Sequence, residues 1–139
     1  MSMDDRRSAP ERTETGERVA VFRDALGEHL GALRARDAER FGATLGDDVV
    51  VVDGTGAVKR GTAEVLRSHA EWFSMPDPWT FDYEIVLTRE TPGSGLALLD
   101  VTYRHTPDAE PARFLLSLVF ERDAAGAFKF VYDQNTPLR

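Results

Sequence analysis

An apolar stripe at helical spacing, followed by a tight break and a β-branched run, most constrains what this chain can fold into. The stripe predicts a long helix over residues 19–35, because apolar side chains three and four residues apart share one helix face; it comprises Val19, Phe22, Leu26, Leu30 and Leu33. Asp37 is a suitable N-cap for a second, short helix that carries Phe41 and Leu45. The four valines at 49–52 then predict a buried strand.

A third helix is predicted after a glycine-rich turn at residues 54–56. It starts at Gly61-Thr62, and the prolines at 76 and 78 end it. Its expected inner side consists of Val65, Leu66, His69, Trp72 and Phe73.

The second half of the chain changes to strand-like runs. Four runs, at about 79–88, 96–106, 113–122 and 128–135, are separated by short segments rich in turn formers. Helices followed by an antiparallel meander predict an α+β fold, with the helices packed on one face of a curved sheet.

Composition sets limits on partners and location. The 139 residues suffice for one domain. Their net charge of −7 argues against nucleic acid or an anionic membrane as partner, since both require a basic footprint. Residues 1–16 are polar and charged, so we expect a disordered leader before a single domain at 17–139. The sequence contains no cysteine, and the cytoplasm is the expected location.

Known cofactor and metal motifs are missing from the sequence. It has no phosphate-binding glycine loop, no HExxH and no GxSxG. Its three histidines, at 29, 69 and 105, show no ligand spacing, so we expect no metal site and no cofactor.

Asp53 admits two interpretations. It follows four valines, and an apolar pocket would raise its pKa and make it a base near neutral pH. Alternatively, its carboxylate caps backbone amides in the turn that begins there.

Three further residues also admit two interpretations. His29 shares a helix face with Phe22, Leu26 and Leu33, where it either donates a hydrogen bond to a substrate oxygen or is a satisfied core histidine. His69 and Trp72 are three residues apart on the third helix, and they either line a cavity or pack in the core.

Strand alternation sorts the second half into two faces without identifying the inner one. Asp100 shares a face with Leu98 and Arg104, while Tyr103 and His105 lie on the other. An acidic residue among leucines suggests a functional role for Asp100. The alternative is an ion pair with Arg104 or Arg113. On the last strand, simple alternation groups Asp133 with Lys129, Val131 and Asn135, opposite Phe128, Phe130 and Tyr132.

The order long helix, break, short helix, strand ending in a carboxylate resembles the opening of the nuclear transport factor 2-like (NTF2-like) superfamily. That superfamily includes ketosteroid isomerases, SnoaL-type polyketide cyclases and limonene-epoxide hydrolases. The resemblance covers residues 19–135, and residues 128–137 are similar to the final strand of SnoaL-like proteins. It implies a cone-shaped fold with three N-terminal helices on a curved, mostly antiparallel sheet, a hydrophobic pocket and a homodimer formed through the sheet.

The resemblance also implies roles for individual residues. Compared with ketosteroid isomerases, His29 falls at the oxyanion-hole tyrosine and Asp53 at the catalytic base, while Leu116 replaces the second oxyanion donor. Compared with limonene-epoxide hydrolases, Asp100 and Asp133 are similar to the two aspartates of the Asp-Arg-Asp triad, and Leu98 replaces its arginine.

Together these observations predict a SnoaL-like protein with a hydrophobic pocket and a cofactor-independent acid–base activity. Its ligand is expected to be a small apolar, carbonyl-containing metabolite, polyketide-like in character. The expected catalytic residues are Asp53, Asp133 and His29; the expected substrate-binding residues are Asp100, His69, Trp72, Tyr103, Leu116 and Leu118. The alternative is a non-catalytic small-molecule-binding or dimeric assembly module.

Overall fold

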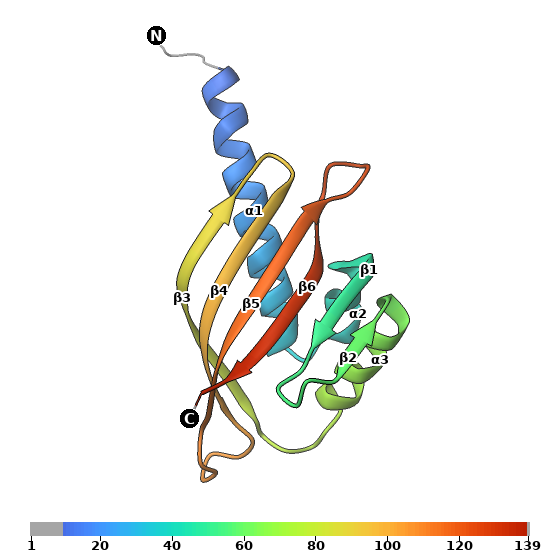
Figure 1. Cartoon of the computed structure of the whole chain (residues 1–139), viewed down its shortest axis with the longest axis vertical. Helices are drawn as coiled ribbons and strands as arrows, with labels where there is room; N and C mark the ends of the chain where they lie inside the picture. Colours follow the sequence, from blue (N-terminus) through green and yellow to red (C-terminus); the bar gives the residue numbers. More distant parts are fainter. Residues whose placement is uncertain (1–9, 139) are drawn as a thin grey trace.

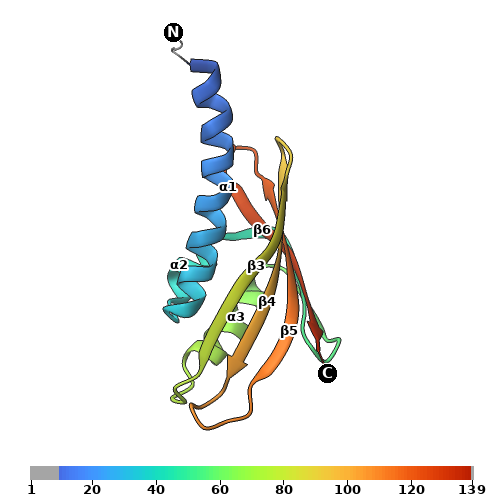
Figure 2. The same cartoon turned by 90° about the vertical axis from the view of Figure 1, so that its left-hand side faces the viewer.

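A computed structural model of the chain describes the backbone of residues 10–138 and the side chains of residues 21–138. The fold is α+β, with helices on one side of a curved sheet (Figures 1 and 2). Within the described residues, no helix combines the length and the apolar character needed to cross a membrane.

The long first helix, α1, runs over Pro10–Arg34. Phe22, Leu26, Leu30 and Leu33 are all buried, which confirms that part of the predicted stripe. The predicted disordered leader at 1–16 needs correction, because the backbone is helical from Pro10 onward. Residues 1–9 of that leader lie outside the described residues.

A tight break separates α1 from α2 (Ala38–Ala43). Arg36 adopts a left-handed φ of 58°, which turns the chain sharply. Asp37 then accepts a hydrogen bond from the Arg40 backbone amide at 3.0 Å and is the predicted N-cap. Leu45, however, is the first residue of strand β1 and does not belong to the short helix.

Six strands form one sheet in the order β2-β1-β6-β5-β4-β3. The pairing is antiparallel except between β1 and β6, which run parallel. The strands are β1 (Leu45–Val52), β2 (Val58–Arg60), β3 (Thr80–Glu90), β4 (Ser94–Arg104), β5 (Ala112–Arg122) and β6 (Phe128–Pro137). The third helix, α3 (Thr62–Phe73), lies where the sequence predicts it, whereas the three-residue strand β2 was not predicted.

A β-bulge in β6 corrects the predicted faces of that strand. Phe130 pairs with Phe120 on β5 and Tyr132 pairs with Val119, so Val131 has no partner between them. One extra residue shifts the alternation by one position. Phe128, Phe130, Asp133 and Asn135 therefore all lie on the inner face of the sheet, the first three of them buried. The prediction that Asp133 lies opposite the two phenylalanines was wrong.

The core lies between α1 and the inner face of the sheet. The ring of Phe22 packs edge-on against Phe120 and Phe128, with centroids 5.7 Å away in each case. Gly95 on β4 lies directly beneath Phe22, at a point where a Cβ atom would overlap the ring. The close approach of α1 to β4 thus requires glycine at this position.

We predict that Gly95→Ala lowers the free energy of unfolding by about 1–3 kcal/mol, because the added methyl group overpacks the core against Phe22. Chemical denaturation of the two proteins measures the difference. Gly93→Ala is the matched control, since a Cβ atom there meets nothing within 4 Å. Equal destabilisation by both substitutions would show that the Phe22 contact is not the cause.

Candidate functional site

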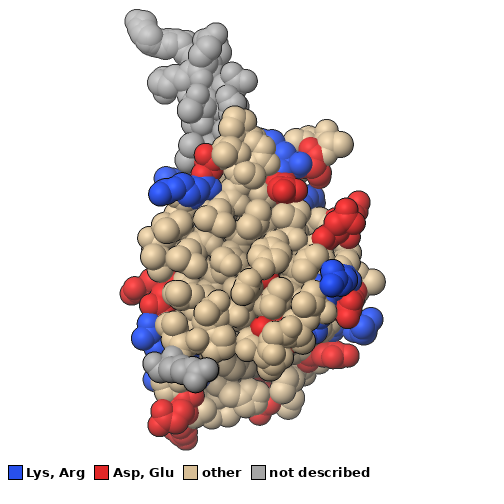
Figure 3. All heavy atoms as spheres, viewed as in Figure 1, with Lys and Arg blue, Asp and Glu red and all other residues tan. Residues whose placement is uncertain are grey.

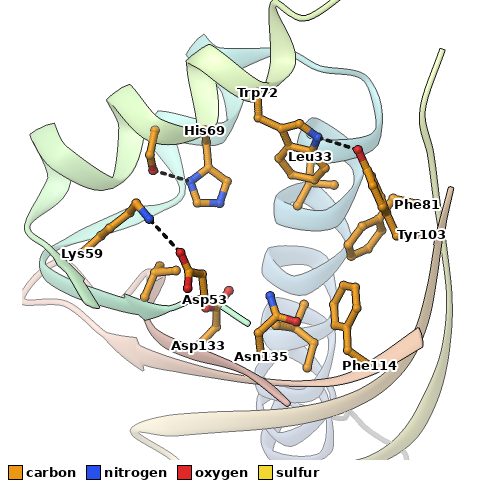
Figure 4. Close-up of a pocket in the computed structure, with 13 residues that line it drawn as sticks. Leu33, Asp53, Lys59, His69, Trp72, Phe81, Tyr103, Phe114, Asp133 and Asn135 are labelled. Atoms are coloured by element: carbon orange, nitrogen blue, oxygen red, sulfur yellow. Dashed lines mark hydrogen bonds and ion pairs between the residues drawn. The ribbon is translucent and has the colours of Figure 1, made fainter. Parts of the chain in front are cut away.

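A cavity of about 430 Å³ opens between the inner face of the sheet, α3 and the end of α1 (Figure 4). Its wall is mainly aliphatic and aromatic, with polar groups concentrated toward β1, β2 and β6. The lining residues are Leu33, Val51, Asp53, Lys59, Ser68, His69, Trp72, Phe81, Tyr103, Phe114, Leu116, Asp133 and Asn135.

Asp133 is the most unusual group in this wall. Its side chain is buried, with 8% of the residue exposed, and its Oδ1 atom has no hydrogen-bond partner among the described residues. Burial without a compensating donor disfavours the charged form, which raises the pKa of the carboxyl group to about 8. Asp133 is therefore mostly a neutral carboxylic acid at pH 7.

Asp53 also lines the cavity, but unlike Asp133 its carboxylate has several hydrogen-bond donors. Its Oδ1 accepts hydrogen bonds from the Thr55 hydroxyl at 2.6 Å, the Thr55 amide at 2.9 Å and the Ala57 amide at 3.1 Å. Its Oδ2 accepts a hydrogen bond from Lys59 Nζ at 3.1 Å. These donors, the Thr55 hydroxyl first, lower the pKa of Asp53. The turn interpretation is confirmed, and the alternative interpretation, a base with a raised pKa, was wrong.

His29 lies in the core and does not line the cavity. The residue is 2% exposed, and its ring packs between Phe41 and Phe130, with centroids at 4.8 and 4.1 Å. The Thr44 hydroxyl donates to the Phe41 carbonyl, so His29 Nδ1 is assigned as the donor to Thr44 Oγ1 at 2.8 Å. Burial lowers the pKa of His29 to about 3. The structure thus favours the core interpretation over the oxyanion role.

Three predicted binding residues do line the cavity from α3 and β4. His69 Nδ1 donates to the Val65 carbonyl at 2.8 Å, which leaves Nε2 as an acceptor, and burial lowers its pKa. Trp72 stacks on Trp79 with centroids 4.3 Å apart and donates to the Tyr103 hydroxyl at 3.2 Å.

Of the other three predicted binding residues, only one lines the cavity. Leu116 lines the cavity, whereas Leu118 is fully buried in the core away from it. Asp100 lies on the outer face of the sheet, where both of its carboxylate oxygens accept from Arg113 at 2.7 and 2.8 Å. The prediction of Asp100 in the pocket is therefore corrected in favour of the ion pair with Arg113.

Sequence reasoning missed Lys59 and Asn135 as site residues. Lys59 lies on β2, a strand too short and polar to be predicted. Asn135 is two residues beyond Asp133 on the same strand face, and that spacing was a usable signal. In the described part of the chain, no group of three or more histidine or acidic side chains is arranged to hold a metal ion.

Comparison with known proteins identifies relatives of this fold. The sequence matches the SnoaL-like domain family over residues 23–135. No curated protein matches it.

Several solved structures resemble the fold at low sequence identity. A ketosteroid isomerase-like protein from Erwinia carotovora atroseptica has a TM-score of 0.73 and 18% identity, covering 88% of this chain and 98% of its own. A protein with a cystatin-like fold from Caulobacter vibrioides has a TM-score of 0.74 and 21% identity, covering 88% and 91%. An NTF2-like protein from Pseudomonas putida has a TM-score of 0.74 and 16% identity, covering 84% of each chain. Identities this low establish a shared fold only.

We predict that Asp133→Asn stabilises the protein relative to wild type, increasingly so as pH rises from about 4 to about 8. In this range the unfolded state loses the Asp133 proton, whose model-compound pKa is 3.8, while the folded state keeps it up to about 8. Wild-type stability should therefore fall with pH by up to about 1.4 kcal/mol per unit relative to the variant. Urea unfolding across this pH range measures the difference.

Asp100→Asn is the control for this experiment, because Asp100 is ion-paired on the outer face. The difference in the free energy of unfolding between Asp100→Asn and wild type should not grow in this way as pH rises. A gap between Asp133→Asn and wild type that stays constant with pH would show that Asp133 is ionised in the folded protein throughout.

Proposed function

The chain belongs to the SnoaL-like domain family, and on that premise we propose that it is a cofactor-independent acid–base enzyme. Its proposed substrate is a small, largely apolar metabolite that carries a carbonyl group, polyketide-like in character. The proposed step is transfer of a proton at the carbon next to that carbonyl.

The observation that carries the proposal is the unpartnered, buried carboxyl group of Asp133 in the cavity wall. A general base is most effective when its pKa lies near the working pH, and Asp133 has a pKa of about 8. In its ionised form the carboxylate removes the α-proton, and the electron pair moves onto the carbonyl oxygen to give an enolate. Asp133, now protonated, returns the proton to a carbon of the enolate and is regenerated.

An enolate oxygen requires a hydrogen-bond donor, and Asn135 is the proposed one. It lines the cavity on the same inner face of β6 as Asp133 (Figure 4). Its side-chain amide carries two N–H groups that can polarise a carbonyl. Asn135 takes over the role that the resemblance implied for His29, which is buried in the core.

The remainder of the cavity supports an apolar substrate. Trp72, Phe81 and Phe114 present aromatic surface to it, and aliphatic side chains of Leu33, Val51 and Leu116 complete the wall. Apolar walls with a few convergent polar groups are typical of small-molecule sites.

The alternative function is a non-catalytic binding or dimeric assembly module. It is favoured by the commitment of two predicted site carboxylates to ion pairs, Asp53 with Lys59 and Asp100 with Arg113. Under that alternative, burial of Asp133 serves ligand recognition alone.

Deuterium exchange separates the two functions. The ketone 2-tetralone has acidic α-protons and an aromatic ring, and its exchange in D₂O is followed by proton NMR. We predict that the wild-type protein accelerates this exchange and that Asp133→Asn reduces the acceleration by about 10²–10⁴-fold.

Asp100→Asn is the matched control and should exchange like wild type, since Asp100 lies on the outer face of the sheet. Asp53→Asn should likewise retain activity, because its carboxylate is committed to the turn and to Lys59. If wild type does not accelerate exchange, or if Asp133→Asn is as active as wild type, the acid–base proposal fails.

We also propose that the protein forms a homodimer through the outer face of the sheet. Figure 3 views this face, which shows a broad area with few charged side chains, most of the acidic and basic groups lying around its margin. Leu87 and Leu98 lie there as a cross-strand pair, and Leu115 and Val119 on β5 are also partly exposed. An apolar sheet face of this kind is suited to a self-complementary contact.

Sedimentation equilibrium at micromolar concentration should detect the dimer. We predict that Leu98→Arg shifts it toward monomer, because a charge would be buried in the contact without a partner. Val58→Arg, at an exposed position on the edge strand β2, is the control and should leave the dimer intact. A wild-type protein that sediments as a monomer would contradict the proposal.

A further inference from the structure

A continuous chain of hydrogen bonds runs from the cavity wall to the surface. Trp72 Nε1 lies 3.2 Å from the Tyr103 hydroxyl, which lies 3.2 Å from His105 Nδ1 (Figure 4 shows the first of these bonds). His105 Nε2 in turn lies 3.1 Å from Asp77 Oδ2. Tyr103 lines the cavity, whereas the His105 and Asp77 side chains are 44% and 37% exposed.

The chemistry of these groups fixes the direction of each bond when His105 is neutral. The Asp77 carboxylate only accepts, so His105 Nε2 carries the proton and Nδ1 is an acceptor. Tyr103 must then donate its hydroxyl hydrogen to Nδ1. The Trp72 indole only donates, so it occupies one lone pair of the Tyr103 oxygen. One lone pair of the Tyr103 oxygen therefore remains free to accept a hydrogen bond. The hydroxyl hydrogen is already donated to His105.

The surface end of this chain is held by Arg36, the residue with left-handed backbone between α1 and α2. Arg36 donates to the backbone carbonyls of Asp77 at 2.9 Å and Trp79 at 2.8 Å, and its guanidinium lies 4.0 Å from the Trp79 ring centroid. Trp79 stacks on Trp72. The segment that carries Asp77 is thus held by the hydrogen bonds from Arg36 and by the stacking of Trp79 on Trp72. These contacts keep the Asp77 carboxylate in place beside His105.

From this geometry we infer that Tyr103 is a specificity residue that accepts a hydrogen bond from a hydroxyl group of the ligand. His105 and Asp77 are positioning residues that hold the Tyr103 hydroxyl hydrogen away from the ligand. The inference deepens the proposed function and rests on its use of this cavity. It adds a substrate class: a hydroxy-carbonyl compound with its carbonyl toward Asp133 and Asn135 and its hydroxyl toward Tyr103 (Figure 4).

Two aromatic probes that differ at one oxygen test this inference. The hydroxyl of 2-naphthol donates a hydrogen bond, whereas the ether oxygen of 2-methoxynaphthalene only accepts one. Affinities are measured by calorimetry at about pH 8.5, because the bond directions above apply to a neutral imidazole. The wild-type protein should bind 2-naphthol about fivefold more tightly, the effect of one additional hydrogen bond.

Two variants separate recognition from a purely structural role. Tyr103→Phe should weaken 2-naphthol binding and abolish the preference, because the accepting oxygen is gone. His105→Leu should strengthen 2-methoxynaphthalene binding and also abolish the preference, because the released Tyr103 hydroxyl can now donate to the ether. Loss of packing alone would weaken both probes equally and leave their ratio unchanged.

Tyr132→Phe is the matched control. Tyr132 lies on the outer face, where its hydroxyl donates to Gln134 Oε1 at 2.7 Å, and the variant should keep the wild-type preference. Equal affinities in wild type, a preference that survives Tyr103→Phe, or binding of neither probe would overturn the inference. Because affinity and not turnover is measured, inactivity in the deuterium-exchange assay would leave this result unaffected.

Discussion

The arrangement of the site depends on one unpaired residue in the last strand. Val131 has no partner on β5, and the strand therefore changes phase between Phe130 and Tyr132. Before the bulge the inner face of β6 carries the phenylalanines that pack against α1, and after it the same face carries Asp133 and Asn135. A strand with strict alternation would place either the rings or the polar pair on the outer face. The bulge lets one strand contribute to both the core and the cavity.

Two carboxyl groups in one wall have pKa values shifted in opposite directions, because one has several hydrogen-bond donors and the other is buried without one. Asp53 follows β1, where the Thr55 hydroxyl, Lys59 and the backbone amides of the turn donate to its carboxylate. Asp133 lies within β6, paired with Val51, where backbone amides belong to the sheet and the neighbouring side chains are mostly apolar. Divergent environments of this kind distinguish a group that stays charged from one that exchanges a proton near neutral pH.

The sequence was informative where a pattern depends on local chemistry. The stripe from Phe22 to Leu33, the Asp37 cap and helix α3 follow from spacing and capping, and each is present. Strand β2 was missed because it is short and polar, and the bulge at Val131 was missed because it depends on how β6 pairs with β5. Asp100 was placed in the pocket although the ion pair with Arg113 was a recognised alternative, and Asn135 was overlooked although it lies two residues from Asp133 on the same face. His69 and Trp72 were found because helix spacing placed them on the inner side of the third helix, whereas strand alternation left open which face of the sheet carries Tyr103.

The stacked indoles beside the cavity have a spectroscopic consequence. The sequence contains two tryptophans, and these are Trp72, in the cavity wall, and Trp79, stacked against it. All tryptophan emission of the protein thus originates from a single pair beside the cavity, with the Arg36 guanidinium over the Trp79 ring. The protein carries its own optical reporter of cavity occupancy, and no engineered label is needed to follow a molecule entering.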